Sequence, residues 1–206
     1  MVYNAAIAYL KGLETLKKYR PYCAGYILLY VLVLICLGDA VFTLVGQIRG
    51  TMNEYMASFS LFSYLILAMG LCYVWMYARA QVAIDDKTVR FAFPANIRPK
   101  QGEPRAMLVF RQGDCDMKFI DKTVTLAHIV RWGWVEDLGY ERIDGSNATE
   151  KGLFPVHEVA VITSDNKRYH WNAAIYSDKQ RREIVTRIAS ASGVMPEGRL
   201  AELVEK

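Results

Sequence analysis

The sequence predicts an α+β protein in which a two-helix transmembrane hairpin is followed by a small antiparallel β-barrel or sandwich, closed by a C-terminal helix. Three observations predict it. Two long apolar runs come first, at about 22–48 and 57–80, short alternating strands begin near residue 81, and a well-marked amphipathic helix covers 178–192. Strands followed by one amphipathic helix are typical of a small β domain whose helix covers part of the core.

Residues 1–20 are predicted to form an amphipathic N-terminal helix. Apolar side chains recur at three- and four-residue steps between Ala5 and Leu16, and lysines lie elsewhere on the helical wheel. Such a helix can lie on a membrane surface. It can equally pack on the following domain or on a partner, because a short apolar stripe does not distinguish these placements.

Residues 21–80 are predicted to form the transmembrane hairpin. A helix needs roughly 20 mostly apolar residues to cross a bilayer core of about 30 Å, and residues 23–37 and 60–76 carry no charge. We do not expect the first run to be a cleaved signal peptide. It begins after twenty residues, exceeds the usual apolar length of such a peptide and is followed by a second run.

Basic residues predict that both termini are cytoplasmic. Lys17, Lys18 and Arg20 precede the first run and Arg79 ends the second, whereas the connecting loop carries one charge of each sign. Because positive charges mark the cytoplasmic side, we expect a two-span integral protein of a bacterial inner membrane with a short external turn.

Residues 81–195 are predicted to form one cytoplasmic domain, with 196–206 as a C-terminal tail. Strand-like segments begin at 81–84 and 88–93 and continue at 106–110, 117–120, 123–126 and 129–135. The clearest hairpin joins 159–163 to 168–171 through four short polar residues. Ser177 and Gln180 predict a capping box at the start of the closing helix, and Gly193 predicts its end. Its apolar stripe is expected to consist of Ile184, Val185, Ile188 and Ala191.

Composition weighs against nucleic-acid binding and known catalytic chemistry. The net charge of the chain is +4, but residues 81–206 hold 19 basic and 18 acidic residues, so that part lacks the concentrated positive charge that phosphate binding needs. His128, His157 and His170 stand far apart, and there is no Cys-x-x-Cys pair. We therefore expect no enzyme activity, no metal and no cofactor.

Two places are candidates for partner binding. Asp39 lies within the first apolar run, where a carboxylate costs about 2.5–3.5 kcal/mol by insertion scales. It can sit near external water at the end of a shorter span, contact another subunit, or line an ion or proton path. Trp132 and Trp134 share one face of a predicted strand. This pair can anchor a partner protein, lie at a lipid interface or pack in the core.

The segment EVAVITSDNKRYHWN at 158–172 and the helix after it carry a resemblance. With the two apolar runs, they resemble bacterial membrane proteins that have two transmembrane helices and a C-terminal pleckstrin-homology-like (PH-like) domain. The resemblance covers roughly residues 80–195 as a pattern. It implies a barrel covered at one end by the C-terminal helix, and a domain that generally serves as a docking platform. The proline-containing loop 94–105 and the polar loop 143–152 depart from the pattern.

The sequence thus favours a non-enzymatic membrane protein whose cytoplasmic domain docks another protein to assemble or regulate a membrane complex. Its partners are expected to be membrane or cytoplasmic proteins, a second copy of the chain among them. One alternative is binding to anionic lipid headgroups. The residues expected to make that contact are Lys17, Lys18, Arg20, Arg98, Lys100 and Arg105. Another is an oligomeric transport or channel subunit that uses Asp39.

Overall fold

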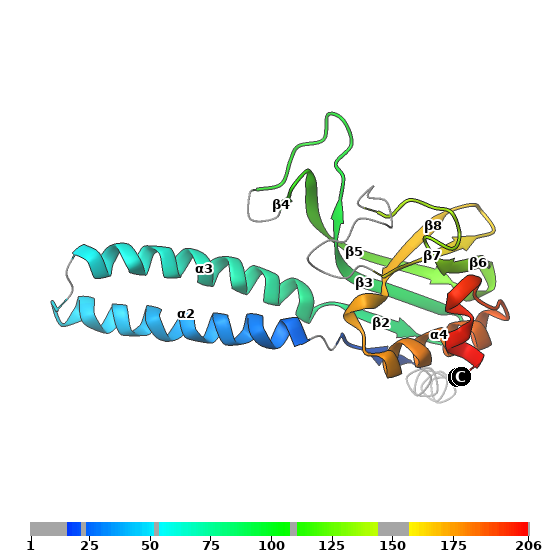
Figure 1. Cartoon of the computed structure of the whole chain (residues 1–206), viewed down its shortest axis with the longest axis horizontal. Coiled ribbons are helices and arrows are strands. Elements are labelled where there is room, and N and C mark those ends of the chain that lie inside the picture. The colour runs from blue at the N-terminus through cyan, green and yellow to red at the C-terminus, as the bar shows by residue number, and fades with distance from the viewer. Residues whose placement is uncertain (1–15, 22–23, 52–53, 108–110, 144–156, 206) are drawn as a thin grey trace, which may run out of the picture. The chain divides into compact units, whose positions relative to one another are not determined.

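A computed structural model describes residues 16–21, 24–51, 54–107, 111–143 and 157–205 (Figure 1). The chain divides into two compact units, which we treat separately. Residues 22–79 form a helical hairpin, and residues 1–21 together with 80–206 form what we call the β domain. Over the described residues there are four α-helices and two antiparallel sheets, which confirms the α+β class.

The helical hairpin consists of α2 (Ala24–Ile48) and α3 (Glu54–Ala78). A turn at Arg49 and Gly50 ends α2, and Gly50 has the positive φ of +65° that glycine adopts without strain. Among the described side chains, one helical segment, Tyr30–Ile48, is long and apolar enough to cross a membrane. The apolar part described in α3, Phe62–Ala78, is shorter.

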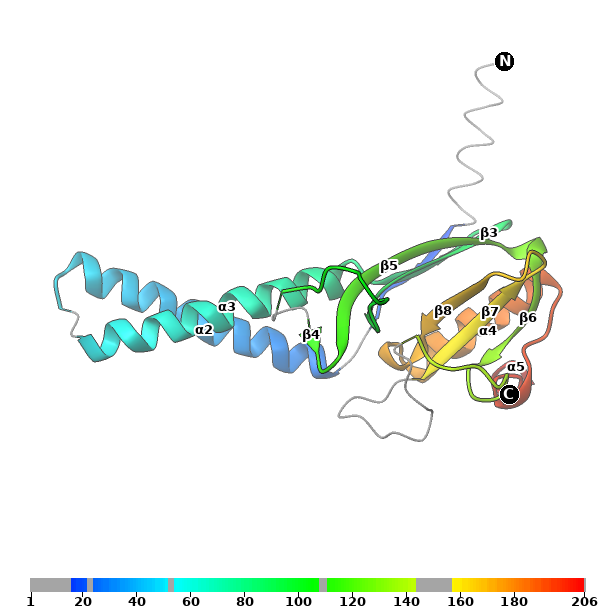
Figure 2. The ribbon, with the colours of Figure 1, turned by 90° about the horizontal axis from the view of Figure 1, so that it is seen from above.

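The β domain contains a five-stranded sheet in the order β1-β2-β3-β5-β4 and a three-stranded sheet in the order β6-β7-β8. The strands are β1 (Lys17–Tyr19), β2 (Gln81–Ile84), β3 (Thr88–Ile97), β4 (Arg111–Gln112), β5 (Cys115–Thr125), β6 (Ile129–Trp134), β7 (Glu158–Thr163) and β8 (Arg168–Asn172). The long β3–β5 pair and the three-stranded sheet are seen as separate layers in Figure 2. Over the described residues the two sheets do not close into a barrel.

Strand β1 corrects the prediction of a helix over residues 1–20. Lys17 to Tyr19 pair antiparallel with β2, Lys17 opposite Ile84 and Tyr19 opposite Val82. Tyr19 is buried in the core, and this packing together with the strand ladder outweighs the local helical periodicity. Residues 1–15, the rest of that prediction, lie outside the described residues.

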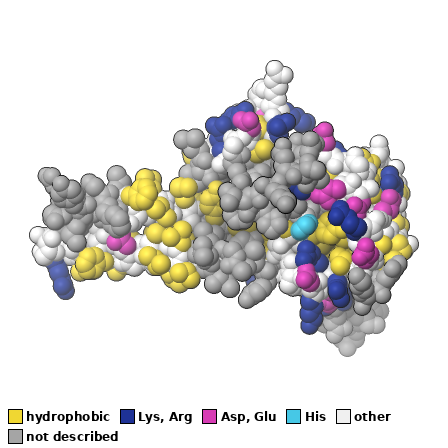
Figure 3. Space-filling view, viewed as in Figure 1, with side chains coloured by type: hydrophobic (Ala, Val, Ile, Leu, Met, Phe, Trp, Pro, Cys, Tyr) yellow, Lys and Arg dark blue, Asp and Glu magenta, His cyan; other side chains and the backbone are white. Residues whose placement is uncertain are grey.

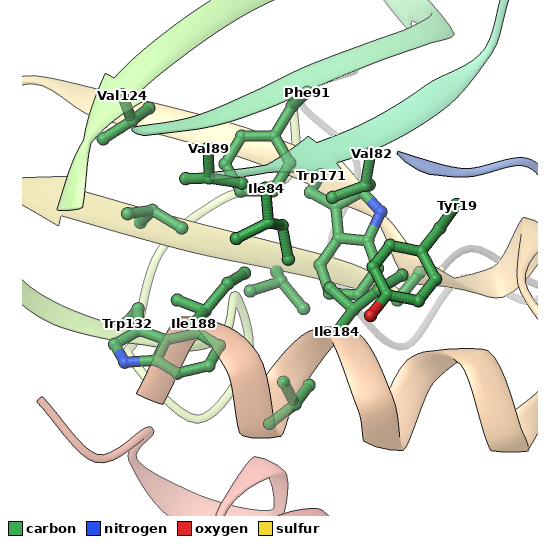
Figure 4. Packing of buried hydrophobic residues seen from close by; sticks show 14 of the residues in the cluster. Tyr19, Val82, Ile84, Val89, Phe91, Val124, Trp132, Trp171, Ile184 and Ile188 are labelled. Carbon is green, nitrogen blue, oxygen red and sulfur yellow. The ribbon is translucent and has the colours of Figure 1, made fainter. Parts of the chain in front are cut away.

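One core joins both sheets and the helix α4 (Asp178–Ser192). Phe91 of the first sheet and Trp171 of the second stack with ring centroids 6.0 Å apart. Ile184 and Ile188 of α4 approach the same cluster from the other side (Figure 4). The domain is therefore held together by apolar side chains of all three elements.

Helix α4 begins and ends as predicted. The Ser177 side chain accepts a hydrogen bond from the Gln180 amide, and the Gln180 side chain accepts one from the Ser177 amide, which makes a capping box. Gly193 ends the helix in the left-handed region. The apolar stripe differs from the prediction at one position, because Ala191 is exposed and Ala189, four residues after Val185, is buried instead.

The predicted tail 196–206 belongs to the domain. A 3₁₀ turn at Gly198–Leu200 and the short helix α5 (Glu202–Glu205) occupy it, and Leu200 is fully buried in the core. Before this turn, the Glu197 amide donates a hydrogen bond of 2.8 Å to the Trp132 carbonyl. The tail prediction was wrong because Leu200 packs into the core of the domain, a contact that sequence periodicity does not reveal.

The predicted strands between residues 106 and 126 are rearranged. The segments 117–120 and 123–126, predicted to be separate, form most of the single long strand β5. The predicted turn at 112–114 is present, with Gly113 at a φ of +60°. The described part of the predicted strand 106–110 is not a strand, and its residues 108–110 lie outside the described residues, as does most of the loop 143–152.

Candidate functional site

The buried side chains of the hairpin are both apolar and polar. Among the described residues, Val33, Cys36 and Thr43 are buried on α2, and Ser63, Gly70 and Met76 are buried on α3. The steps of three and seven residues along α2, from Val33 to Cys36 and on to Thr43, and of seven from Ser63 to Gly70 on α3, are typical of left-handed helix pairs. The helices pack closely at Gly70, where an added Cβ would lie 2.7 Å from Cγ2 of Val33.

Asp39 is a partly exposed residue of α2 with an unusual carboxylate. Its Oδ2 atom is buried and has no hydrogen-bond partner among the described residues. Tyr64 of α3 donates to the Ala40 carbonyl at 3.5 Å. The side chains of Ser58 and Ser60 lie outside the described residues. Asp39 thus carries a buried carboxylate oxygen whose donor is not among the described residues.

The two tryptophans lie in the core or against it. Trp132 is fully buried, and its indole Nε1 donates a hydrogen bond of 2.9 Å to the Val194 carbonyl. Trp134 is half-buried, packs against the core cluster and lies 5.7 Å from the His157 ring. The candidate partner role of Trp132 is thus wrong, because a fully buried ring with a satisfied N–H has nothing to offer a partner.

The candidate lipid contacts Lys17, Lys18 and Arg20 lie in or next to β1. Lys17 forms an ion pair with Glu183 of α4, so the negative charge of Glu183 largely compensates its positive charge within the domain. The Arg20 carbonyl accepts a hydrogen bond of 2.9 Å from the Gln180 side chain. The Lys18 and Arg20 side chains are exposed.

The candidate lipid contacts Arg98, Lys100 and Arg105 are all exposed and share one loop between β3 and β4. The acidic residue within that loop, Glu103, is hydrogen-bonded to Lys118 at 3.3 Å. This bond lowers the pKa of Glu103 and keeps its charge paired. The structure thus brings together three of the six residues predicted to contact lipid.

A buried contact between a carboxylate and an imidazole in the three-stranded sheet was missed by sequence reasoning. Glu158 of β7 is almost fully buried and lies against Nδ1 of His170 in β8. The Glu158 carboxylate also accepts a hydrogen bond of 3.1 Å from the Ile143 amide. Alternation along β8 places His170 on the side opposite Trp171. It does not reveal that both faces of β7 are buried, which is what encloses the pair.

Within the described parts of the chain, no group of three or more His, Cys, Asp or Glu side chains could hold a metal ion. Glu158 and His170 are the most enclosed titratable pair, and the structure gives them a structural role between β7, β8 and Ile143. No protein-family model, curated protein or solved structure matches this chain. Its function has to be argued from its own residues.

Proposed function

We propose that this chain is a non-enzymatic integral membrane protein that crosses the membrane twice. Its β domain, on the cytoplasmic side, docks a partner protein to assemble or regulate a membrane complex. The observation that carries the proposal is the placement of apolar side chains in the hairpin. Leu34 and Phe42 of α2 are 64% and 67% exposed, whereas Thr43 and Ser63 are 5% and 6% exposed. Lipid is the solvent in which an apolar outside and a polar contact between helices are stable.

The length and the end of α3 support a second span. Its 25 residues extend about 37 Å at a rise of about 1.5 Å per residue, enough for a bilayer core of about 30 Å. Phe62 and Trp75 are exposed, like the apolar residues of α2. The Arg79 guanidinium lies 4.6 Å from the centre of the Trp75 ring. Tryptophan and arginine together are common where a helix leaves the bilayer.

The pairing of β1 with β2 supports the same conclusion independently. Strand β1 precedes α2, strand β2 follows α3, and the two are hydrogen-bonded neighbours in one sheet. Two strands of one sheet lie on one side of a membrane. The chain between them therefore crosses an even number of times, so a crossing by α2 requires a return by α3.

The strand order of the β domain supports a docking role by resemblance. The strands β1, β2, β3 and β5 form an antiparallel meander, β6, β7 and β8 form a second, and α4 follows. Without the two-residue β4, these are seven strands and a C-terminal helix, the pattern on which the resemblance to PH-like domains rests, although the two sheets do not close into the barrel that the resemblance implies. Such domains generally serve as platforms for other proteins.

Asp39 gives the proposal its test. In the proposed assembly, a donor from a neighbouring chain stabilises the Asp39 carboxylate, whose Oδ2 atom has no hydrogen-bond partner among the described residues. Asp39→Asn is expected to leave insertion and abundance unchanged while reducing the yield of native partners copurified in mild detergent. Asp39→Leu is expected to insert normally and to lose those partners. Recovery of the partners at wild-type yield with Asp39→Leu would remove Asp39 from the docking surface.

A further inference from the structure

The loop 98–107, which we call the basic loop, carries a concentration of positive charge. Arg98, Lys100 and Arg105 are exposed, and the acidic Glu103 is paired with Lys118 of β5. Counting the two β5 residues that contact the loop, Lys118 and the buried Asp116, the group has four basic and two acidic residues. Figure 3 shows Lys and Arg side chains gathered around the projection where Figure 1 places this loop.

The basic loop has a fixed base. Asp116 of β5 is fully buried, and its Oδ2 atom accepts a hydrogen bond of 3.1 Å from the Ala106 amide. Within the loop, the Glu103 amide donates to the Lys100 carbonyl at 3.0 Å, and Gly102 has a φ of +89°. Hydrogen bonds therefore hold the backbone that carries the basic side chains.

An exposed apolar side chain stands beside these charges. Met107, at the end of the basic loop, is 77% exposed. An apolar side chain next to several cations is the combination that binds the interface of an anionic bilayer. The cations attract lipid phosphates and the apolar group enters the acyl boundary. An acidic protein surface would satisfy the cations but not Met107.

We infer that the basic loop and Met107 bind the headgroups of anionic phospholipids in the leaflet that the β domain faces. The inference rests on the proposed function, because the membrane hairpin holds the domain close to that leaflet. Tethering raises the effective concentration of headgroups, so a small number of cations is enough. Each Lys or Arg near an anionic surface changes binding roughly fivefold. Replacing three of them is expected to lower the ratio of bound to free loop on the order of 100-fold.

The test uses the full chain in nanodiscs made of neutral lipid alone or with added anionic phospholipid. A solvatochromic fluorescent amino acid replaces Met107, Leu34 or Ser190, one at a time. Position 34 reports on the outer face of α2, and position 190 is an exposed position of α4. We expect the probe at 107 to shift to the blue with anionic lipid, and to lose this shift in 1 M salt or in the variant Arg98→Gln, Lys100→Gln, Arg105→Gln.

The controls separate the outcomes. The probe at 34 is expected to be blue-shifted in both discs and the probe at 190 in neither. Inorganic phosphate added to neutral discs is expected to leave the probe at 107 unchanged. The same emission at 107 in both discs, or a shift that survives the triple substitution, would overturn the lipid contact and leave the hairpin intact. A probe at 34 that reports water would overturn the membrane hairpin and the inference with it.

Discussion

The helical hairpin and the β domain place their apolar side chains on opposite sides. In the hairpin, large apolar residues such as Leu34 and Phe42 face outward and Thr43 is enclosed. In the β domain, Trp132 and Trp171 are fully enclosed and charged side chains cover the surface. The proposed membrane location accounts for this difference. In water, burial of apolar surface drives folding, whereas in lipid that force is absent and close packing holds helices together.

The helical hairpin interrupts the β domain in sequence. The hairpin is inserted between β1 and β2, two neighbouring strands of one sheet. Each strand continues into one end of the hairpin, and the two strands are paired in register in the same sheet. The β domain therefore has two covalent links to the helical hairpin.

The largest expected effect is the loss of the β domain core. Ile188→Asp puts a charge where α4 packs against Trp132 and Ile84, and should destabilise the domain by more than about 3 kcal/mol. Pulse proteolysis of the full-length protein in urea measures this. Ala191→Asp, an exposed position of the same helix, is the matched control and should change stability little. Equal stability of the two variants would mean that α4 does not cover the core.

The next effect concerns the hairpin. Gly70→Ala places a Cβ 2.7 Å from Cγ2 of Val33, a stiff β-branched side chain. We expect a loss of about 1–3 kcal/mol, measured by circular dichroism during SDS titration of the detergent-solubilised protein. Adding Val33→Ala should restore most of it. Gly38→Ala meets nothing within 4 Å and should be neutral. Equal effects at Gly70 and Gly38 would contradict close packing of α2 on α3.

A smaller effect is expected at the start of α4. Ser177→Ala removes the side-chain oxygen that accepts the Gln180 amide, and should cost about 1 kcal/mol. Ser190→Ala, at an exposed position inside the helix, should be neutral or slightly stabilising. Urea-dependent pulse proteolysis resolves the two. A neutral Ser177→Ala would show that the capping box contributes nothing to the domain.

The smallest effect depends on pH. Arg131 donates hydrogen bonds of 2.7 and 2.8 Å to the Glu197 carboxylate, and lowers its pKa below the ordinary value of 4.5. Because the folded-state pKa is depressed, this stabilisation is present above about pH 4.5 and is lost as the pH falls through the folded-state pKa.

Glu197→Gln should therefore lower the melting temperature slightly at pH 7, and this difference should shrink as the pH falls below about 4.5. Glu141→Gln, another exposed carboxylate, is the control for general charge effects. A difference between Glu197→Gln and the wild type that is as large at low pH as at neutral pH would exclude the ion pair as its cause.

Local signals predicted the closing helix, whereas β1 depended on a distant pairing. Ser177, Gln180 and Gly193 are short-range signals, and each does what its spacing predicts. Lys17, by contrast, pairs with Ile84 across the whole hairpin. No periodicity within residues 1–20 reports a partner so far along the chain. A three-residue edge strand shows too short an alternation of apolar and polar residues to outweigh the helical periodicity around it.

The candidate site residues also divide into those whose placement the sequence predicted and those whose placement depends on distant parts of the chain. The sequence gives the positive charges of Arg98, Lys100 and Arg105, and charged side chains of this kind are expected to be exposed, as these are. The exposure of Met107 was not predicted, because alternation around it indicates a strand. The pair Glu158 and His170 was not predicted either, since enclosure of the outer face of β7 depends on chain that packs over it.

Accessibility of single cysteines on the two sides of the membrane tests the two-span hairpin most directly. In a chain whose native cysteines are replaced by alanine, Thr51→Cys lies after the turn that ends α2, and Ser190→Cys lies on the exposed side of α4. A membrane-impermeant maleimide added to intact cells should label Thr51→Cys and should label Ser190→Cys only after permeabilisation. Labelling of Ser190→Cys in intact cells, with Thr51→Cys protected or equally labelled, would contradict a hairpin that crosses the membrane and returns to a cytoplasmic domain.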